Sequence, residues 1–360
     1  MGSWNNCKEN VAPFAAMAAV ESSIVAMHVF YKAAHAKGLN FLVYITYSYI
    51  LGSLLLLLLT LIFSRNGLPP FKRPVLYRII LLSVIGFIAR MCSYKGIEYS
   101  SPALASSIST LSPAFTFVLA LLFRMEVLEL RSSTTRAKLI GTIVSVSGAL
   151  VAVLYKGPTI LSSRSPKVTF HSLQTSQTNW AIGGSLYVVD QLLNATSYIL
   201  QAQILKMYPA KLIVAFMYCL GVTIITIPVS FMAERELSVW ILRPDITLAT
   251  VVFSGFFGQA LIGVIYSCCL PLKGPLYVSI FKPFSIVIAT TASFIFFGDA
   301  LRLGSVVGGI VLLLGFYAVL WGKAKEQGES KNCGSENLRA STDAHTSPLL
   351  QSYIDEKYVE

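Results

Sequence analysis

The chain alternates long apolar stretches with short polar segments, and ten of these stretches are long enough to cross a membrane. An α-helix needs about 20 apolar residues to span a hydrocarbon core of about 30 Å. We therefore predict an all-α membrane protein with ten transmembrane helices. The predicted spans are residues 11–31, 41–63, 75–94, 101–123, 138–155, 180–203, 210–232, 247–270, 275–297 and 301–321.

The ten spans fall into two similar halves of five. Landmarks recur at nearly constant spacing: Pro113 and Pro283 are 170 residues apart, and each half ends with two glycines seven residues apart. Because each half has an odd number of spans, the second half enters the membrane from the opposite side. The pattern predicts two inverted five-helix repeats, the usual architecture of alternating-access transporters with a substrate site near the membrane midplane.

The same pattern divides the chain into five parts. Residues 11–157 form the first repeat and residues 180–322 the second, joined by a loop at 158–179 that is rich in Ser, Thr and Gln. Residues 1–10 form a short cytosolic N-terminus. The tail at 323–360 is polar and of mixed charge, which predicts a disordered cytosolic segment.

The net charge of +11 raises the question of nucleic acid, but the positions of the basic residues argue against it. Lys and Arg gather in the short loops. On the side of the N-terminus there are about 15 of them, against about 9 on the other side, leaving out two within spans and two in the distal tail. By the positive-inside rule this bias places both termini in the cytosol. We expect the lipid bilayer and a small-molecule substrate as partners, no nucleic acid, and leave a homodimer open.

Two acidic residues, Glu21 and Asp190, lie near the middle of predicted spans and 169 residues apart, so they take matching places in the two repeats. A charged side chain at this depth costs about 2.5–3.5 kcal/mol on insertion scales, so it needs a reason. One hypothesis is that both residues contact the amino group of a zwitterionic substrate or exchange protons during transport. The alternative is that they brace helices through hydrogen bonds.

Polar residues accompany these two acids at helical spacing. His28 lies seven residues after Glu21, while Asn194 and Gln201 continue a stripe that starts at Asp190. A histidine in this position titrates near neutral pH and is a candidate to assist transport. Alternatively, His28 lies close to the membrane surface and has no part in it. Gln259, in the eighth span, is a further candidate for substrate contact or for packing.

Two basic residues lie within predicted spans, and each is a candidate partner for a substrate carboxylate. Arg90 belongs to the third span and offers bidentate hydrogen bonds. Lys282 directly precedes Pro283 in the ninth span. The alternative for both is that the long side chain reaches the lipid headgroups.

Pro113 and Pro283 interrupt the fourth and ninth spans. A proline removes one helical hydrogen bond and frees a carbonyl of the preceding turn. Such breaks are tolerated in membranes where they line a cavity, and the freed backbone groups then bind polar parts of a substrate. The alternative is a bend needed only for packing.

Nothing in the sequence indicates enzymatic chemistry or a cofactor. The chain shows no P-loop, nucleotide fingerprint or catalytic triad, and its six cysteines have no metal-ligand spacing. We therefore expect neither an enzyme nor a metal. A transporter of phosphate-bearing solutes, of the nucleotide-sugar type, and a membrane-embedded enzyme remain alternatives.

Several strings distributed along the chain resemble a known family of plant membrane proteins. The strings are GIEYSSP at 96–102, LSPAFTF at 111–117, FRME at 123–126, GTIVS at 141–145, LYKGP at 154–158, KGP at 273–275 and WGKAKE at 321–326. Together they resemble the plant drug/metabolite exporters, also called walls-are-thin-related or usually-multiple-acids-move-in-and-out transporters, which have two EamA domains. The resemblance covers about residues 10–326.

The resemblance implies a ten-helix drug/metabolite-transporter fold with both termini in the cytosol. It also implies export or facilitated movement of small organic solutes, most often amino acids or related metabolites such as auxin. Members of the family reside in the plasma membrane or the vacuolar membrane, and for this chain we expect the plasma membrane.

Overall fold

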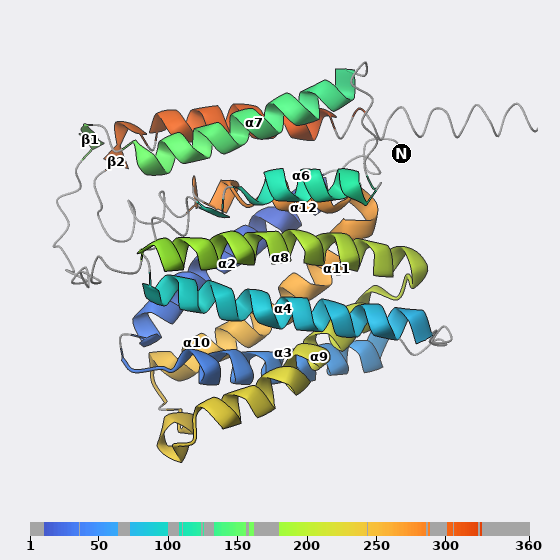
Figure 1. Ribbon diagram of the computed structural model, residues 1–360, viewed down its shortest axis with the longest axis vertical. Coiled ribbons are helices and arrows are strands. Elements are labelled where there is room, and N and C mark those ends of the chain that lie inside the picture. The colour runs from blue at the N-terminus through green and yellow to red at the C-terminus, as the bar shows by residue number, and fades with distance from the viewer. Residues whose placement is uncertain are drawn as a thin grey trace, which may run out of the picture.

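The structure is a computed structural model of the full chain. It describes residues 11–35, 37–63, 73–99, 108–109, 111–123, 125, 133–155, 158–161, 180–242, 244–285, 287–288, 301–304, 306–322 and 325. Long helices make up most of these residues and lie roughly in layers (Figure 1).

The helices follow the predicted apolar stretches. In the first half they are α2 (Ala12–His35), α3 (Phe41–Phe63), α4 (Arg73–Tyr99), α6 (Ser112–Leu122) and α7 (Ser133–Leu154). In the second half they are α8 (Trp180–Met207), α9 (Lys211–Ala233), the short η2 (Leu237–Trp240), α10 (Ile246–Phe253), η3 (Ser254–Leu261), α11 (Ile262–Lys273), α12 (Pro275–Ile280) and an unlabelled apolar helix, Val306–Gly322.

Five helical segments in the described residues are long and apolar enough to cross a membrane, and two shorter apolar helices accompany them. The five are Ala12–His35, Phe41–Phe63, Arg73–Gly96, Lys211–Ala233 and Ile246–Lys273; the two are Ser112–Leu122 and Val306–Gly322. The prediction of membrane-spanning helices is therefore confirmed at this level. The ten-helix inverted arrangement and the domain boundaries stay predictions.

One small feature was not expected from the sequence. Strand β1 (Thr159–Leu161) pairs antiparallel with strand β2 (Leu301–Arg302), so the loop between the halves is tied to the segment before the last helix. Three residues are too few for a recognisable alternation of apolar and polar positions.

The two halves contact each other through several helix pairs. Helix α4 packs along α8, and α3 packs along α9. The continuous helix formed by α10, η3 and α11 packs against α2, and the short helices α6 and α12 pack together. In Figure 1, α4 and α8 run side by side in front of the other helices. Most of the packing therefore joins residues of one half to residues of the other.

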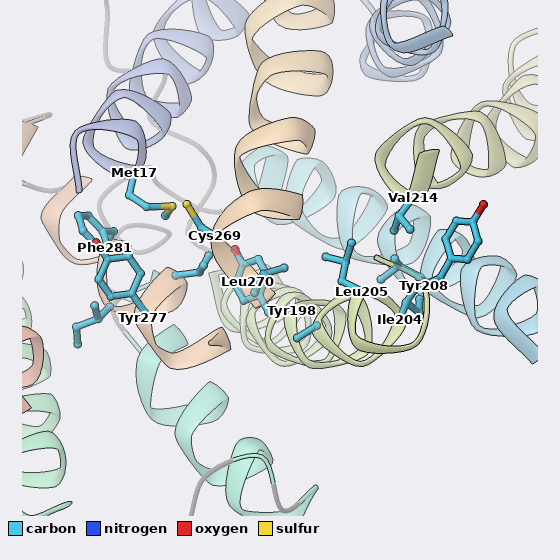
Figure 2. Packing of buried hydrophobic residues seen from close by; sticks show 14 of the residues in the cluster. Met17, Tyr198, Ile204, Leu205, Tyr208, Val214, Cys269, Leu270, Tyr277 and Phe281 are labelled. Carbon is cyan, nitrogen blue, oxygen red and sulfur yellow. The ribbon is translucent and has the colours of Figure 1, made fainter. Parts of the chain in front are cut away.

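A large apolar cluster holds these helices together. Figure 2 shows it extending from Met17 of α2, beside Tyr277 and Phe281, to Tyr208 and Val214 at the end of α8 and the start of α9. All five of these residues are no more than 5% exposed. In a membrane the hydrophobic effect does not drive helices together, because lipid tails are as apolar as the side chains. Close van der Waals packing of this kind therefore supplies much of the stabilisation.

Glycines join α7 to the last helix. A Cβ built on Gly141 would lie 2.8 Å from the Gly315 carbonyl oxygen, and one built on Gly322 would lie 3.1 Å from the Thr134 carbonyl oxygen. Partner numbers fall along one helix as they rise along the other, so the two helices are antiparallel. Figure 1 shows them side by side, the last helix in orange-red behind the green α7. The glycines predicted to line a helix face therefore make a contact within the chain.

Polar contacts tie the loop after α2 to the loop before α10. The Lys37 ammonium donates to Asp245 at 2.6 Å, and the Asn40 amide donates to Glu234 at 2.7 Å. The hydrogen bond from Lys37, together with one from the backbone N–H of Ile246, holds the pKa of the Asp245 carboxyl below its ordinary value. This exposed pair therefore keeps both charges at neutral pH and is lost only as the pH falls through that lowered pKa.

The glycine contact generates a prediction. Gly315→Ala places its Cβ 2.6 Å from the Gly141 carbonyl oxygen, so the helices have to separate, whereas a Cβ at Gly309 meets nothing within 4 Å. Overpacking of this kind costs about 1–3 kcal/mol. We expect Gly315→Ala to lower the melting temperature of the purified protein and Gly309→Ala to leave it unchanged or raise it. Equal melting temperatures for the two variants would contradict the close antiparallel contact.

Candidate functional site

Helix α2 buries a carboxylate among apolar side chains. Glu21 is 0% exposed, and within the described part of the chain neither of its carboxylate oxygens has a hydrogen-bond partner. The nearest opposite charge is the Lys282 ammonium, whose Nζ lies 3.5 Å from Oε1. The Lys282 side chain is 17% exposed, so one member of this ion pair is accessible and the other is not.

A break between helices delivers Lys282 to this position. Gly274 adopts φ 87°, a conformation that favours glycine, and ends α11; Pro275 then starts the six-residue α12. After Ile280 the chain turns, and the backbone N–H of Lys282 donates to the carbonyl of Ser279 at 3.0 Å. Pro283 lies in this turn, where its missing N–H disrupts the helix.

The carbonyl next to this proline is satisfied locally. Both the backbone N–H and the side-chain hydroxyl of Ser285 donate to the Lys282 carbonyl, at 3.1 and 2.6 Å. The Lys282 carbonyl is therefore not free to bind a substrate. What the break contributes to the site is the Lys282 side chain. Pro113 takes a different place: it lies in the first turn of α6, beside Ser112, whose buried hydroxyl has no hydrogen-bond partner.

Helix α8 supplies a second buried carboxylate, Asp190, which is 3% exposed. The Asn194 amide donates to its Oδ1 at 2.8 Å, and the Gln191 amide donates to its Oδ2 at 2.9 Å. Asp190 is thus held in place by two neighbours of its own helix. One of them, Asn194, was predicted from its spacing; the other, Gln191, was not.

Helix α4 supplies Arg90, whose guanidinium lies among the phenols of Tyr49, Tyr94 and Tyr218. The Tyr49 hydroxyl approaches it but makes no hydrogen bond of standard geometry. Arg90 also interacts electrostatically with Asp190, without the direct contact that Lys282 makes with Glu21. The residue as a whole is partly exposed.

His28 lies two turns after Glu21 on α2 and is exposed. It interacts electrostatically with Lys282 and Arg90, which come from other helices. The exposed imidazole therefore lies within range of both basic groups of the site. The structure thus brings five of the predicted residues into one electrostatic neighbourhood: Glu21, His28, Arg90, Asp190 and Lys282.

Two other predicted residues have packing partners. The Gln201 amide donates to the Ser267 hydroxyl at 3.1 Å, and its side chain is 7% exposed, so it braces α8 against α11. Gln259 lies in η3, and its Cβ packs directly against Gly52 of α3. Gln259 remains partly exposed.

Two tyrosines lie near the ion pair: Tyr266, which shares a face of the eighth predicted span with Gln259, and Tyr198, which was not among the predicted site residues. The buried Tyr266 hydroxyl has no hydrogen-bond partner and interacts electrostatically with Glu21 and Lys282. Its ring meets that of Tyr198 edge to face, with centroids 5.5 Å apart. Tyr198 continues the α8 stripe eight residues after Asp190, a spacing from which its place could have been predicted.

The mid-span segment η3 was also unexpected. Residues Ser254–Leu261 form a π-helix inside an otherwise continuous helix, and such segments are frequent at functional sites. The Tyr44 hydroxyl donates to the Ser254 hydroxyl at 2.9 Å, which ties α3 to the start of this segment. The sequence of this segment contains no proline that would have indicated it. A π-helical turn needs only a change in hydrogen-bond register, from i→i+4 to i→i+5.

Comparison with known proteins identifies the family. Residues 14–154 match the EamA-like transporter family. The WAT1-related protein At5g40240 of Arabidopsis thaliana is 47% identical, over 98% of this chain and 95% of the relative. The WAT1-related protein At4g15540 of the same plant is 46% identical, over 99% of this chain and 98% of the relative. The chain belongs to the WAT1-related family of plant drug/metabolite exporters. The resemblance drawn from the short strings is confirmed, and the chain is a multi-pass membrane protein of a transporter family.

The fold of this WAT1-related chain also recurs in a solved structure. A protein of known crystal structure superimposes with a TM-score of 0.64, over 86% of this chain and 95% of its own, at 12% sequence identity. At this identity the likeness shows a shared fold and nothing about substrate. Since it covers most of both chains, the fold it supports includes both halves.

The buried ion pair generates a prediction on stability. Removing one partner of a buried pair costs about 3–5 kcal/mol, because the other charge is left alone, whereas removing both costs much less. We expect Lys282→Gln to destabilise the WAT1-related chain strongly and the double variant Glu21→Gln/Lys282→Gln to regain most of the loss in chemical unfolding experiments. The exposed ion pair between Lys37 and Asp245 serves as the control. The effects of Lys37→Gln and Asp245→Asn on the free energy of unfolding should be nearly additive. Additive effects at Glu21 and Lys282 would contradict a direct ion pair.

Proposed function

We propose that the protein is an alternating-access exporter or facilitator of small organic solutes, most often amino acids or related metabolites such as auxin. The observation that carries the proposal is the group of charged residues in the membrane interior, from four separate segments: Glu21, Arg90, Asp190 and Lys282. Charges at such depth are costly, and in membrane proteins they generally mark substrate or ion pathways.

The contacts between helices support two inverted repeats of five helices each. The first helix of each half packs against the third of the other: α8 against α4, and α2 against α10–α11. The second helices pair as α3 and α9, the fourth as α6 and α12, and the last as α7 and Val306–Gly322. A twofold exchange of the halves leaves this pattern unchanged, as a pseudo-twofold axis in the membrane plane requires.

The chemistry of the charged groups suits a zwitterionic or carboxylate-bearing solute. Arg90 is partly exposed and has no direct carboxylate contact among the described residues, so it is free to bind a substrate carboxylate through paired hydrogen bonds. Glu21 and Asp190 supply negative charge for an amino group. The phenols around Arg90 add aromatic surface for the apolar part of a solute.

A phosphate-bearing solute fits the same residues less well. It favours several basic groups that gather without acidic partners. Here Lys282 is paired with Glu21, and Lys95 lies over the ring of Phe41, 4.8 Å from its centroid. Of these three basic residues, Arg90 is the one that we propose would balance a phosphate.

The distribution of basic residues supports a topology in which both termini face the cytosol. The loops on the side of the N-terminus carry the larger share of Lys and Arg. We propose the plasma membrane as the site of action, on the family resemblance.

Reconstitution tests the proposal. Vesicles containing the protein and loaded with a radiolabelled amino-acid mixture should lose label faster than vesicles without protein. Arg90→Gln should reduce the initial rate by about 10- to 100-fold, since a charge-assisted bond of about 1.5–3 kcal/mol is lost. Asp245→Asn, a charge change outside the site, should leave the rate near that of the wild type. Efflux unaffected by Arg90→Gln would remove Arg90 from the substrate path. If neither these vesicles nor a second set loaded with radiolabelled auxin lose label faster than vesicles without protein, the proposed substrate class is wrong.

A further inference from the structure

The four interior charges balance across the two halves. Glu21 belongs to the first half, and its ion-pair partner Lys282 to the second. Asp190 belongs to the second half, and its largest electrostatic attraction is to Arg90 of the first. Each half therefore contributes one acid and one base, and each acid is balanced by a base from the other half. The set is neutral as a whole.

Resting on the proposed function, we propose that Lys282 and Arg90 act as built-in counterions that replace protons, so that substrate moves without proton coupling. A carrier that crosses the membrane interior with unbalanced carboxylates has to neutralise them, and a proton is the usual means. Here Lys282 already neutralises Glu21 at 3.5 Å, and Arg90 balances Asp190 at longer range. The empty carrier can therefore change sides with no proton bound.

The surroundings of Glu21 contain few other groups that titrate near neutral pH. Tyr266 of α11 and Tyr198 of α8 lie close to the pair, and neither carries a carboxyl or an imidazole. The elements α10 and η3, which also pack against α2, carry no ionisable side chain between residues 246 and 261. Further groups facing the site are Tyr44 and Tyr49 of α3, Arg90, Cys92 and Tyr94 of α4, Tyr187 and Asp190 of α8, and Tyr218 of α9.

His28 is the exception, because it carries an imidazole and lies on the same helix face as Glu21, within electrostatic range of both bases. Its protonation adds a fifth charge to a neutral set, and it repels Lys282 and Arg90. The experiment therefore uses His28→Gln as its background, so that any remaining pH dependence reports on the four balanced residues.

The first readout is transport of the radiolabelled amino-acid mixture in vesicles between about pH 5 and pH 8, the range in which carboxylates in unusual surroundings and histidines titrate. In the His28→Gln background the rate should stay constant within about twofold, and a trapped pH dye should record no proton movement with substrate. Adding Lys282→Gln should make the rate fall by up to about tenfold per pH unit as the pH rises, because Glu21 then needs a proton. Adding Glu21→Gln to that variant should restore the flat profile.

The matched control is Lys37→Gln in the same background, which removes a positive charge from the exposed pair with Asp245. It should leave the profile flat. A background that already moves protons with substrate, or a Lys282→Gln variant with a flat profile, overturns the counterion proposal while the transport function stands. Absence of transport of every tested solute overturns the transport function instead.

The second readout needs no substrate. We expect the melting temperature of Lys282→Gln to rise on acidification relative to its background, because the unpaired Glu21 binds a proton in the folded state and burial favours the neutral acid. The double variant Glu21→Gln/Lys282→Gln should lose this slope, and Lys37→Gln should never show it. Equal slopes in the background and in Lys282→Gln would refute the counterion role even for a protein whose solute is unknown.

Discussion

The cost of placing a charge in the membrane interior is the constraint on which the rest of this structure depends. Glu21 is fully buried, with no hydrogen bond to either oxygen among the described residues, and its one close compensation there is the ammonium of Lys282. That ammonium reaches it only because the chain breaks after α12 and turns at Pro283. Since the two residues come from opposite halves, satisfying one charge also fixes how the halves meet.

The repeats are similar but not identical at this point, and the difference has a physical meaning. The residue before Pro283 is Lys282, while the residue before Pro113 is Ser112, whose buried hydroxyl has no partner. The first half places its own base elsewhere, at Arg90 of α4, within electrostatic range of Asp190. The proposed pair of repeats would thus carry an asymmetric set of charges, with a short ion pair on one side and a longer interaction on the other.

Much of this could be predicted from the sequence, because length and hydropathy alone determine where a helix can cross a membrane. The spacing of Glu21 and Asp190 also predicted two buried acids. The pairing of Glu21 with Lys282 could not be predicted, since 261 residues separate them and only the tertiary packing decides which base meets which acid. Gln201 shows the reverse case: its stripe suggested the site, yet its amide is used to hold α8 against Ser267 of α11.

A buried ion pair is weak support for stability, because well-packed apolar residues of similar size often serve as well or better. If Glu21 and Lys282 were present only to hold helices together, leucines would do so at lower cost, as the apolar cluster around Met17 and Phe281 does nearby. Their presence is better explained by a need for charge at this depth. A solute with a charged group can exchange with either partner, and the partner left behind can then pair with the solute. If the proposed transport function holds, the 3.5 Å separation, longer than the 2.6 Å of the exposed pair between Lys37 and Asp245, suits an ion pair that opens for a solute.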